Sequence, residues 1–177
     1  MWRRWLAGVA LAAALDAGAS IAATSAGDRV FEAHSPGSGA DTALERVTPV
    51  EWVRLRSVGG AGGSSYLEFS GARSPVRLRA AGTIEFTVHE MALSGDAIAS
   101  LRLYALDPKG DARQLDLVER AIGPDAWKAL PSHTLPLTAH ALAGDLARLV
   151  PNATLAPGEY CLGGPGTHDG FCFGVDP

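Results

Sequence analysis

The chain has 177 residues, of which 47% are apolar and 19% charged, and its formal net charge at pH 7 is −4. An intrinsically disordered chain would carry fewer apolar residues and more net charge, so this composition indicates a folded domain. The mildly acidic charge argues against non-specific nucleic-acid binding, which depends on basic side chains that neutralise phosphates. We therefore expect a globular domain that does not bind nucleic acid.

The first 26 residues have the pattern of a secretory signal peptide. Arg3 and Arg4 form a positive segment, and a ten-residue apolar run from Leu6 to Leu15 follows. Ten residues are too few to span a hydrocarbon core of about 30 Å, and the run lacks the polar face of a surface helix. Small residues after the run predict cleavage between positions 19 and 26. We expect export to the periplasm or the medium, with no transmembrane segment after cleavage.

The next segment, residues 27–45, is small and polar, and we interpret it as a flexible leader. Beyond it, apolar and polar residues alternate with a period of two, which is typical of strands with one face on a core. The pattern predicts short strands at residues 50–56, 66–70, 76–80, 84–88, 101–104, 114–117, 133–138, 146–150, 159–162 and 171–175. The one helical candidate is short, at residues 124–130.

These elements predict a single all-β domain over residues 46–177, an antiparallel β-sandwich of about seven to nine short strands with little helix. Matching apolar residues across neighbouring strands predicts two hairpins. Leu103 opposite Leu115 closes a five-residue loop, and Leu78 opposite Ile84 closes a shorter one. The second pair of strands is also compatible with membership of two different sheets.

The two cysteines of the chain, Cys161 and Cys172, favour one disulfide in an exported protein. A register that matches Tyr160 with Phe173 puts the cysteines directly opposite each other, at a Cα separation of about 4.5–5.5 Å that a disulfide accepts. A redox pair and a metal site are the alternatives. Redox pairs usually have Cys-x-x-Cys spacing, and a zinc site needs more ligands than one histidine and one aspartate of the intervening loop supply. We expect a structural disulfide and no cofactor.

The run from Leu155 to Tyr160, Leu-Ala-Pro-Gly-Glu-Tyr, resembles the turn before a late strand in immunoglobulin-like sandwiches of uncharacterised exported bacterial proteins. In such sandwiches a Tyr hydroxyl bonds back to the preceding corner. The resemblance extends through Val175 and implies an immunoglobulin-like fold without implying an activity. Unlike the antibody pattern, Tyr160 immediately precedes Cys161, so the two side chains point to opposite faces and a core disulfide between sheets is not expected.

Candidate site residues are few, and none completes a catalytic motif. His168 and Asp169 are adjacent in the Gly-rich loop between the cysteines, where a histidine beside a carboxylate would be exposed. Arg77 and Arg79 share one strand face and predict a positive stripe, although ion pairing with nearby acids such as Glu85 explains them more simply. Four aromatic residues form a possible sugar-binding platform: Trp52, Tyr66, Tyr104 and Trp127.

The export signal, the strand pattern and the incomplete motifs together predict an exported, non-enzymatic β-sandwich that acts as a binding or interaction module of the cell envelope. Its expected partner is an envelope protein or a glycan. Two alternatives stay open. One is a carbohydrate-binding domain that uses the aromatic residues, and the other is a loop-based hydrolase or metal-dependent enzyme that uses His133, His140, His168 and Asp169.

Overall fold

The computed structural model describes residues 30–36, 40–55, 63–80, 82–89, 98, 100–117, 131–144, 146–164 and 169–177. Within these residues the fold is all-β, and every strand pair but one is antiparallel, which confirms the predicted class. Fourteen strands are present, more than predicted, in two sheets of five and nine strands. The predicted signal peptide and the helix at 124–130 lie outside the described residues. No helix in the described residues is long and apolar enough to cross a membrane.

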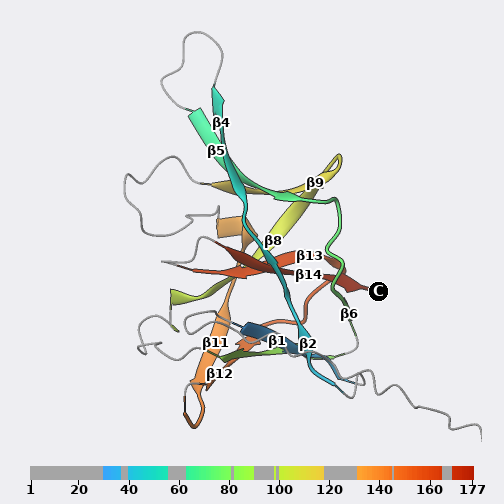
Figure 1. The fold of residues 1–177 in the computed structure, drawn as a ribbon, viewed down its shortest axis with the longest axis vertical. Helices are drawn as coiled ribbons and strands as arrows, with labels where there is room; N and C mark the ends of the chain where they lie inside the picture. The colour runs from blue at the N-terminus through green and yellow to red at the C-terminus, as the bar shows by residue number, and fades with distance from the viewer. Residues whose placement is uncertain are drawn as a thin grey trace, which may run out of the picture.

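The five-stranded sheet has the order β11-β12-β7-β1-β2 and forms the lower layer in Figure 1. Its strands are β1 (Val30–His34), β2 (Thr42–Ala43), β7 (Glu85–His89), β11 (Leu137–Ala141) and β12 (Leu146–Pro151).

Strand β1 corrects the prediction of a flexible leader over residues 27–45. It lies between β2 and β7, pairs with β7 along its whole length, and buries Phe31 and Ala33 in the core. The alternation of apolar and polar residues in β1 covers only five residues, so small polar residues dominate the composition of the segment 27–45 on which the prediction was based. Tertiary pairing, which a local pattern does not contain, orders the strand.

The larger sheet has the order β3-β14-β13-β8-β9-β5-β4, with β6 on β14 in parallel and β10 on β8. Its strands are β3 (Glu45–Val47), β4 (Val50–Leu55), β5 (Gly63–Ser70), β6 (Arg77–Arg79), β8 (Arg102–Lys109), β9 (Ala112–Leu117), β10 (Thr134–Leu135), β13 (Gly158–Gly163) and β14 (Gly170–Asp176), and the 3-10 turn η1 (Pro131–His133) precedes β10. The β4–β5 hairpin extends away from the other strands at the top of Figure 1.

The larger sheet is curled. Strands β3 and β4 stand at opposite ends of its order, yet only Thr48 and Pro49 separate them in the chain. So short a connection spans at most about 11 Å, so the two ends of the sheet meet.

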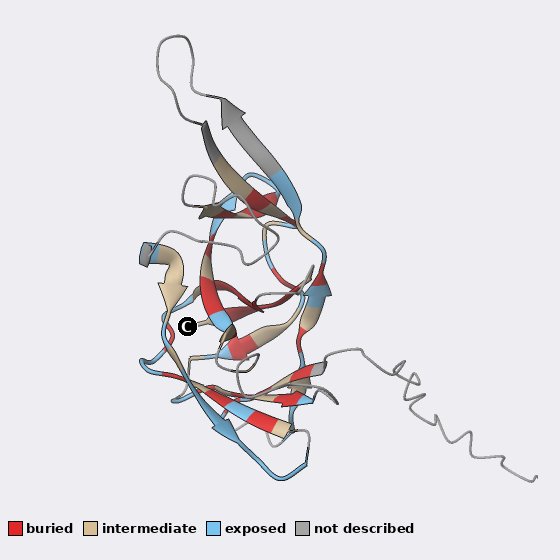
Figure 2. Ribbon diagram, turned by 90° about the vertical axis from the view of Figure 1, so that its left-hand side faces the viewer, coloured by how far each residue is buried: buried red, intermediate tan, exposed pale blue. Residues whose placement is uncertain are grey.

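Two hydrophobic cores lie on opposite faces of the same strands. Buried residues occur in both sheets (Figure 2). Leu103 and Phe173 lie in the first core, which fills the space between the two sheets. Tyr104 and Leu115 lie in the second, which the curled sheet encloses together with the disulfide. Tyr160 and Cys161 point to opposite faces as predicted, but both are buried because each face has its own core.

The cysteine hairpin has the predicted register, with Cys161 opposite Cys172 and Tyr160 opposite Phe173, and the disulfide is formed. The hydroxyl of Tyr160 donates a hydrogen bond of 2.7 Å to the carbonyl oxygen of Ala156, which closes the preceding corner.

The other two predicted hairpins differ from the structure, one in its register and one in its pairing. Strands β8 and β9 do form a hairpin, but Lys109 pairs with Ala112 across a two-residue turn in which Gly110 has φ +63°. Leu103 pairs instead with Leu162 of β13. Strands β6 and β7 belong to different sheets, the alternative that the sequence left open.

Candidate functional site

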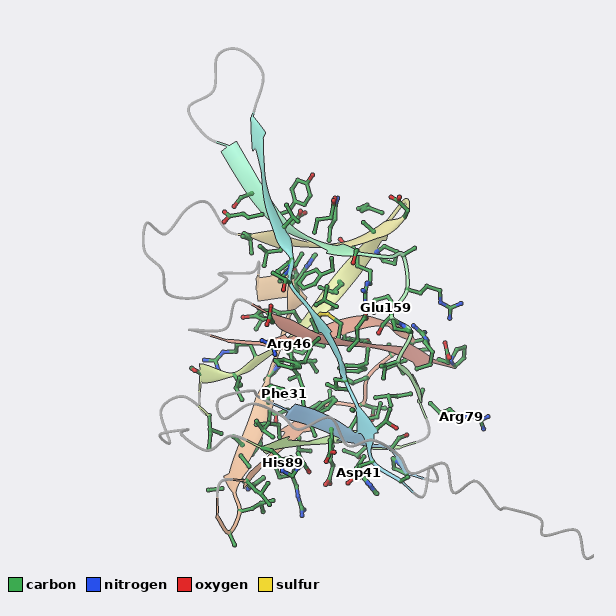
Figure 3. The ribbon with its side chains drawn as sticks, in the orientation of Figure 1. Phe31, Asp41, Arg46, Arg79, His89 and Glu159 are labelled. Carbon is green, nitrogen blue, oxygen red and sulfur yellow. A yellow bond between two sulfur atoms is a disulfide. The ribbon has the colours of Figure 1, made fainter. Side chains whose placement is uncertain are left out.

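The predicted arginine stripe does not exist as a free surface. Arg77 is half-buried, and its guanidinium bonds to the carboxylates of Glu159 and Asp176. Arg79 is exposed at the end of β6 (Figure 3). Glu85, the expected partner of Arg77, lies in the other sheet and forms an ion pair with Arg148 at 3.6 Å.

Asp169 is bound to neighbouring side chains, contrary to the expectation of an exposed loop carboxylate. It accepts a 2.6 Å hydrogen bond from Nε of Arg46 and a 2.5 Å hydrogen bond from the hydroxyl of Thr48, and its side chain is 16% exposed. These contacts attach the end of the cysteine loop to β3 and the residue after it. His168 lies outside the described residues.

The aromatic platform is wrong for Tyr104, which is 3% exposed and belongs to the second core. Burial raises the pKa of its hydroxyl, while the nearby charge of Arg102 acts in the opposite direction. The backbone of Trp52 pairs with Tyr66 between β4 and β5. The side chain of Trp52 and the whole of Trp127 lie outside the described residues.

Of the three histidines of the enzyme alternative, the two that the structure describes sit on different elements. His133 ends η1, and its Nδ1 is buried without a hydrogen-bond partner, while its Nε2 lies 3.9 Å from Asp107. His140 is exposed on β11. Across the described ranges, no three His, Cys, Asp or Glu side chains gather closely enough to hold a metal ion.

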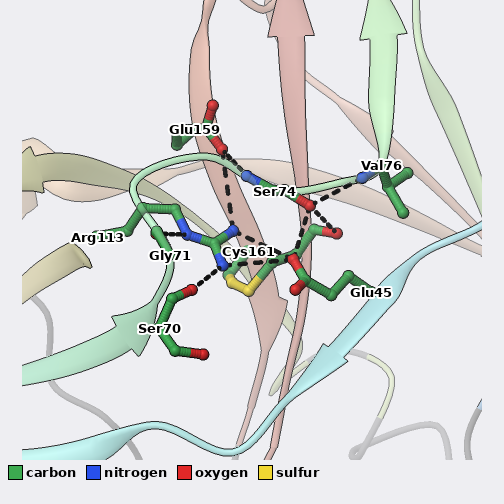
Figure 4. The surroundings of a disulfide bond; sticks show 9 residues. Glu45, Ser70, Gly71, Ser74, Val76, Arg113, Glu159 and Cys161 are labelled. Atoms are coloured by element: carbon green, nitrogen blue, oxygen red, sulfur yellow. Dashed lines mark hydrogen bonds and ion pairs between the residues drawn. A yellow bond between two sulfur atoms is a disulfide. The ribbon is translucent and has the colours of Figure 1, made fainter. Parts of the chain in front are cut away.

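Sequence reasoning missed a buried charged cluster beside the disulfide, which we call the arginine cluster and define as Arg113, Glu45, Glu159 and Ser74 (Figure 4). Arg113 is 0% exposed, and its guanidinium donates to the carbonyl oxygens of Gly71 at 3.0 Å and Ser70 at 2.8 Å.

The acidic side of the arginine cluster is equally well bound. A carboxylate oxygen of Glu45 accepts from Arg113 at 3.3 Å and from the Ser74 hydroxyl at 2.7 Å. Glu159 is 5% exposed and accepts from the Ser74 backbone N–H at 2.8 Å. A buried charge is tolerated when it is paired and hydrogen-bonded in this way. The cluster holds four segments together and presents no open chemistry to a substrate.

A different feature lies at the edge of the five-stranded sheet. Exposed strand edges invite pairing with other chains, and proteins usually shorten them or place charges on them. Of the four strands at sheet ends in the described part, β2 and β3 are only two and three residues long, and β4 carries Glu51 and Arg54. Strand β11 has five residues, Leu137–Ala141, and no Asp, Glu, Lys or Arg.

The backbone groups of β11 can be assigned a direction. The N–H of Leu142 donates to Leu146 at 2.9 Å, and the N–H of Asn152 donates to Pro136 at 3.0 Å, so these pairs are hydrogen-bonded at both ends of the β11–β12 ladder. Hydrogen-bonded and non-bonded pairs alternate in an antiparallel ladder. The N–H and C=O groups of Leu137, Ala139 and Ala141 therefore point away from β12.

A pocket of about 340 Å³ opens beside this edge. It is lined mainly by apolar residues: Ile98, Leu101, Leu137, Ala139 and Leu149, with Thr138. Ala139 pairs with the fully buried Leu149, so it lies on the core-side face of the sheet, yet it is exposed. Strand β11 therefore extends past the edge of the first core. In the described part of the chain, the larger sheet does not cover its core-side face at Ala139.

No protein-family model matches the chain, and no curated protein or solved structure is significantly similar to it. Sequence reasoning placed a strand at residues 133–138 but did not identify β11 as an edge, because strand order is a tertiary property. The absence of charge over residues 137–141 is the signal that was present in the sequence.

Proposed function

We propose that this chain is an exported, non-enzymatic interaction module of the cell envelope, which binds its partner at the edge of β11. The observation that carries the proposal is the uncharged edge of β11 beside the apolar pocket. Five residues of open strand edge are a liability that selection usually removes, and strand edges are recurrent sites of peptide recognition. A partner that covers the edge and fills the pocket explains why both persist.

An immunoglobulin-like sandwich is part of the proposal, and strand order supports it. The order β1-β7-β12-β11 corresponds to the A-B-E-D sheet of that fold, and β14-β13-β8 corresponds to G-F-C. The bond from Tyr160 to Ala156 fits the tyrosine corner at the start of strand F. Compared with that fold, the β4–β5 hairpin is an insertion that extends the larger sheet beyond β9.

Export is also proposed, on the signal-peptide pattern and on the disulfide. A buried disulfide between Cys161 and Cys172 suits an oxidising compartment such as the periplasm or the medium. Neither alternative function gains a specific observation, because Asp169 is bound within the fold and Tyr104 is buried. We therefore propose neither the hydrolase nor the carbohydrate-binding domain.

Site-specific photo-crosslinking tests the proposal. A benzophenone amino acid replaces Ala139 at the β11 edge or, as the matched control, the exposed Arg79 on β6, and the full chain is irradiated in envelope fractions of cells that produce it. We expect one discrete adduct from position 139 and none of that size from position 79. Equal labelling from both positions, or no adduct from position 139, would contradict binding at this edge.

A further inference from the structure

We propose that the partner's contact is an extended acidic peptide segment, which joins β11 as a sixth strand and inserts one apolar side chain into the pocket. This inference rests on the proposed function and specifies the chemistry of the partner at the same site. Three independent features of the edge support it: the direction of its backbone groups, the position of the pocket, and the charge on the outer face of the sheet.

The backbone requires a strand as the ligand. Leu137, Ala139 and Ala141 direct their N–H and C=O groups away from β12, at intervals of two residues. An extended chain presents its own N–H and C=O groups at this same interval, so it can pair with all three residues. In known recognition by strand addition, main-chain hydrogen bonds supply affinity and side-chain pockets supply specificity.

The pocket selects one side chain. Residues directly opposite each other on paired strands share a face, so the partner residue opposite Ala139 points to the core side, where the pocket lies. The volume of about 340 Å³ is near the lower end of the range of roughly 300–1,000 Å³ for small-molecule sites. With Leu101 and Leu149 in its lining, it has room for a large aliphatic side chain.

Charge on the outer face selects an acidic strand. His140 and Arg148 are direct cross-strand neighbours on this face, and the side chain of Arg148 is 49% exposed. Glu85 is the carboxylate that pairs with Arg148, and it approaches from β7 on the far side of β12. A partner carboxylate opposite His140 would lie near the Arg148 guanidinium and would accept a hydrogen bond from the imidazole, whereas a lysine there would be repelled by Arg148. A second copy of β11 supplies no carboxylate at this position, so this complementarity favours a different chain as the occupant.

Synthetic peptides provide the test. The probe is a blocked seven-residue peptide, Thr-Val-Asp-Leu-Asp-Val-Thr, in which the central Leu and the two Asp residues fall on opposite faces. Binding to the oxidised mature protein is measured by calorimetric titration. We expect replacement of the central Leu by Ala to weaken binding at least about tenfold, because it leaves the pocket unfilled. Replacement of both Asp by Lys is expected to weaken binding several-fold, by an amount that shrinks in high salt.

Two variants of the protein check the geometry. Ala139→Pro removes an outward N–H while keeping the bonds to β12, and is expected to abolish binding, whereas Arg79→Ala, an exposed change on β6 away from this edge, is the control that leaves binding unchanged. His140→Glu is expected to reverse the preference, so that the Lys peptide binds more tightly than the Asp peptide. This charge reversal remains informative if the proline variant does not fold.

The outcomes separate this inference from the proposed function. If position 139 crosslinks to an envelope component but no peptide binds, the strand-addition inference is wrong and the interaction function stands. If neither crosslinking nor peptide binding occurs, both fail. A homodimer in sedimentation that Ala139→Pro disrupts would identify a second copy as the occupant and overturn the inference.

Discussion

Gly174 of β14 lies directly beneath the guanidinium of Arg77, so closely that a β-carbon at position 174 would overlap Nη1 and Cζ of that arginine. This close approach lets Arg77 reach across β14 to Glu159 while it also binds Asp176. The absence of a side chain at position 174 therefore determines whether the nearly buried carboxylate of Glu159 keeps its closest counter-charge.

Gly174→Ala is predicted to destabilise the protein by about 1–3 kcal/mol, because it displaces Arg77 and weakens the pairing of Glu159. Urea unfolding monitored by circular dichroism measures the change. Gly158→Ala is the matched control, since its β-carbon would meet only the Tyr160 ring at ordinary contact distances. In an Arg77→Ala background the cost of Gly174→Ala is expected to disappear, and an unchanged cost would show that the two residues are not coupled.

Arg113→Met is predicted to be more damaging, at about 3–5 kcal/mol, because it leaves Glu45 and two backbone carbonyl oxygens without their buried cationic donor and leaves Glu159 with Arg77 alone. The same unfolding experiment measures it, with the exposed Arg79→Met as the control at under about 0.5 kcal/mol. Adding Glu45→Gln to Arg113→Met is expected to recover part of the loss. If Arg113→Met alone unfolds at the wild-type midpoint, the arginine cluster contributes nothing to stability.

The disulfide is predicted to resist reduction in the native state, because both sulfur-bearing residues are fully buried. Treatment with dithiothreitol and iodoacetamide, followed by mass spectrometry, is expected to show alkylation only at urea concentrations that unfold the chain. Replacing both cysteines by alanine is expected to cost roughly 2–3 kcal/mol for a loop this short. Rapid alkylation without urea would mean that the hairpin opens locally.

Asp176 provides a prediction about pH. A hydrogen bond from Arg77 lowers the pKa of its carboxyl below the ordinary value of 3.8, and the charges of Arg77 and Arg73 act in the same direction. A depressed pKa contributes stability that is present above pH 3.8 and lost as the pH falls through the depressed value. Carbon-13 NMR of the carboxyl is expected to give a midpoint below 3.8, which Arg77→Gln moves back toward 3.8. A wild-type midpoint at or above 3.8 would contradict this assignment.

The C-terminal hairpin could be predicted from the sequence because one register places the two cysteines opposite each other and also pairs their apolar and aromatic neighbours. The register predicted for β8 and β9 was wrong because it assumed that one face of each strand is exposed to solvent. Leu115 shares the second core with Tyr104 and Leu106, whereas Leu103 faces the first core. Residues directly opposite each other on paired strands share a face of the sheet. Leu103 and Leu115 lie on opposite faces, in different cores, so they cannot be direct cross-strand neighbours.

The arginine cluster was beyond sequence reasoning for a similar reason. Arg113 occupies a polar position in an alternating strand, and only the curl of the larger sheet brings Glu45 and Glu159, from distant parts of the chain, around it. Ion pairing was the simpler explanation for Arg77, but the partner expected for it, Glu85, is close to it in sequence. Its actual partners lie on β13 and β14.

Strands β8 and β13 each supply side chains to both cores. Because these two strands contribute to both cores, neither core can unfold while the other stays folded. The β4–β5–β9 region is therefore expected to unfold at the same temperature as the rest of the domain. Differential scanning calorimetry is expected to record one endotherm whose calorimetric and van't Hoff enthalpies agree. Because proteases degrade partly unfolded chains, such all-or-none behaviour keeps the protein either fully folded or fully exposed to degradation.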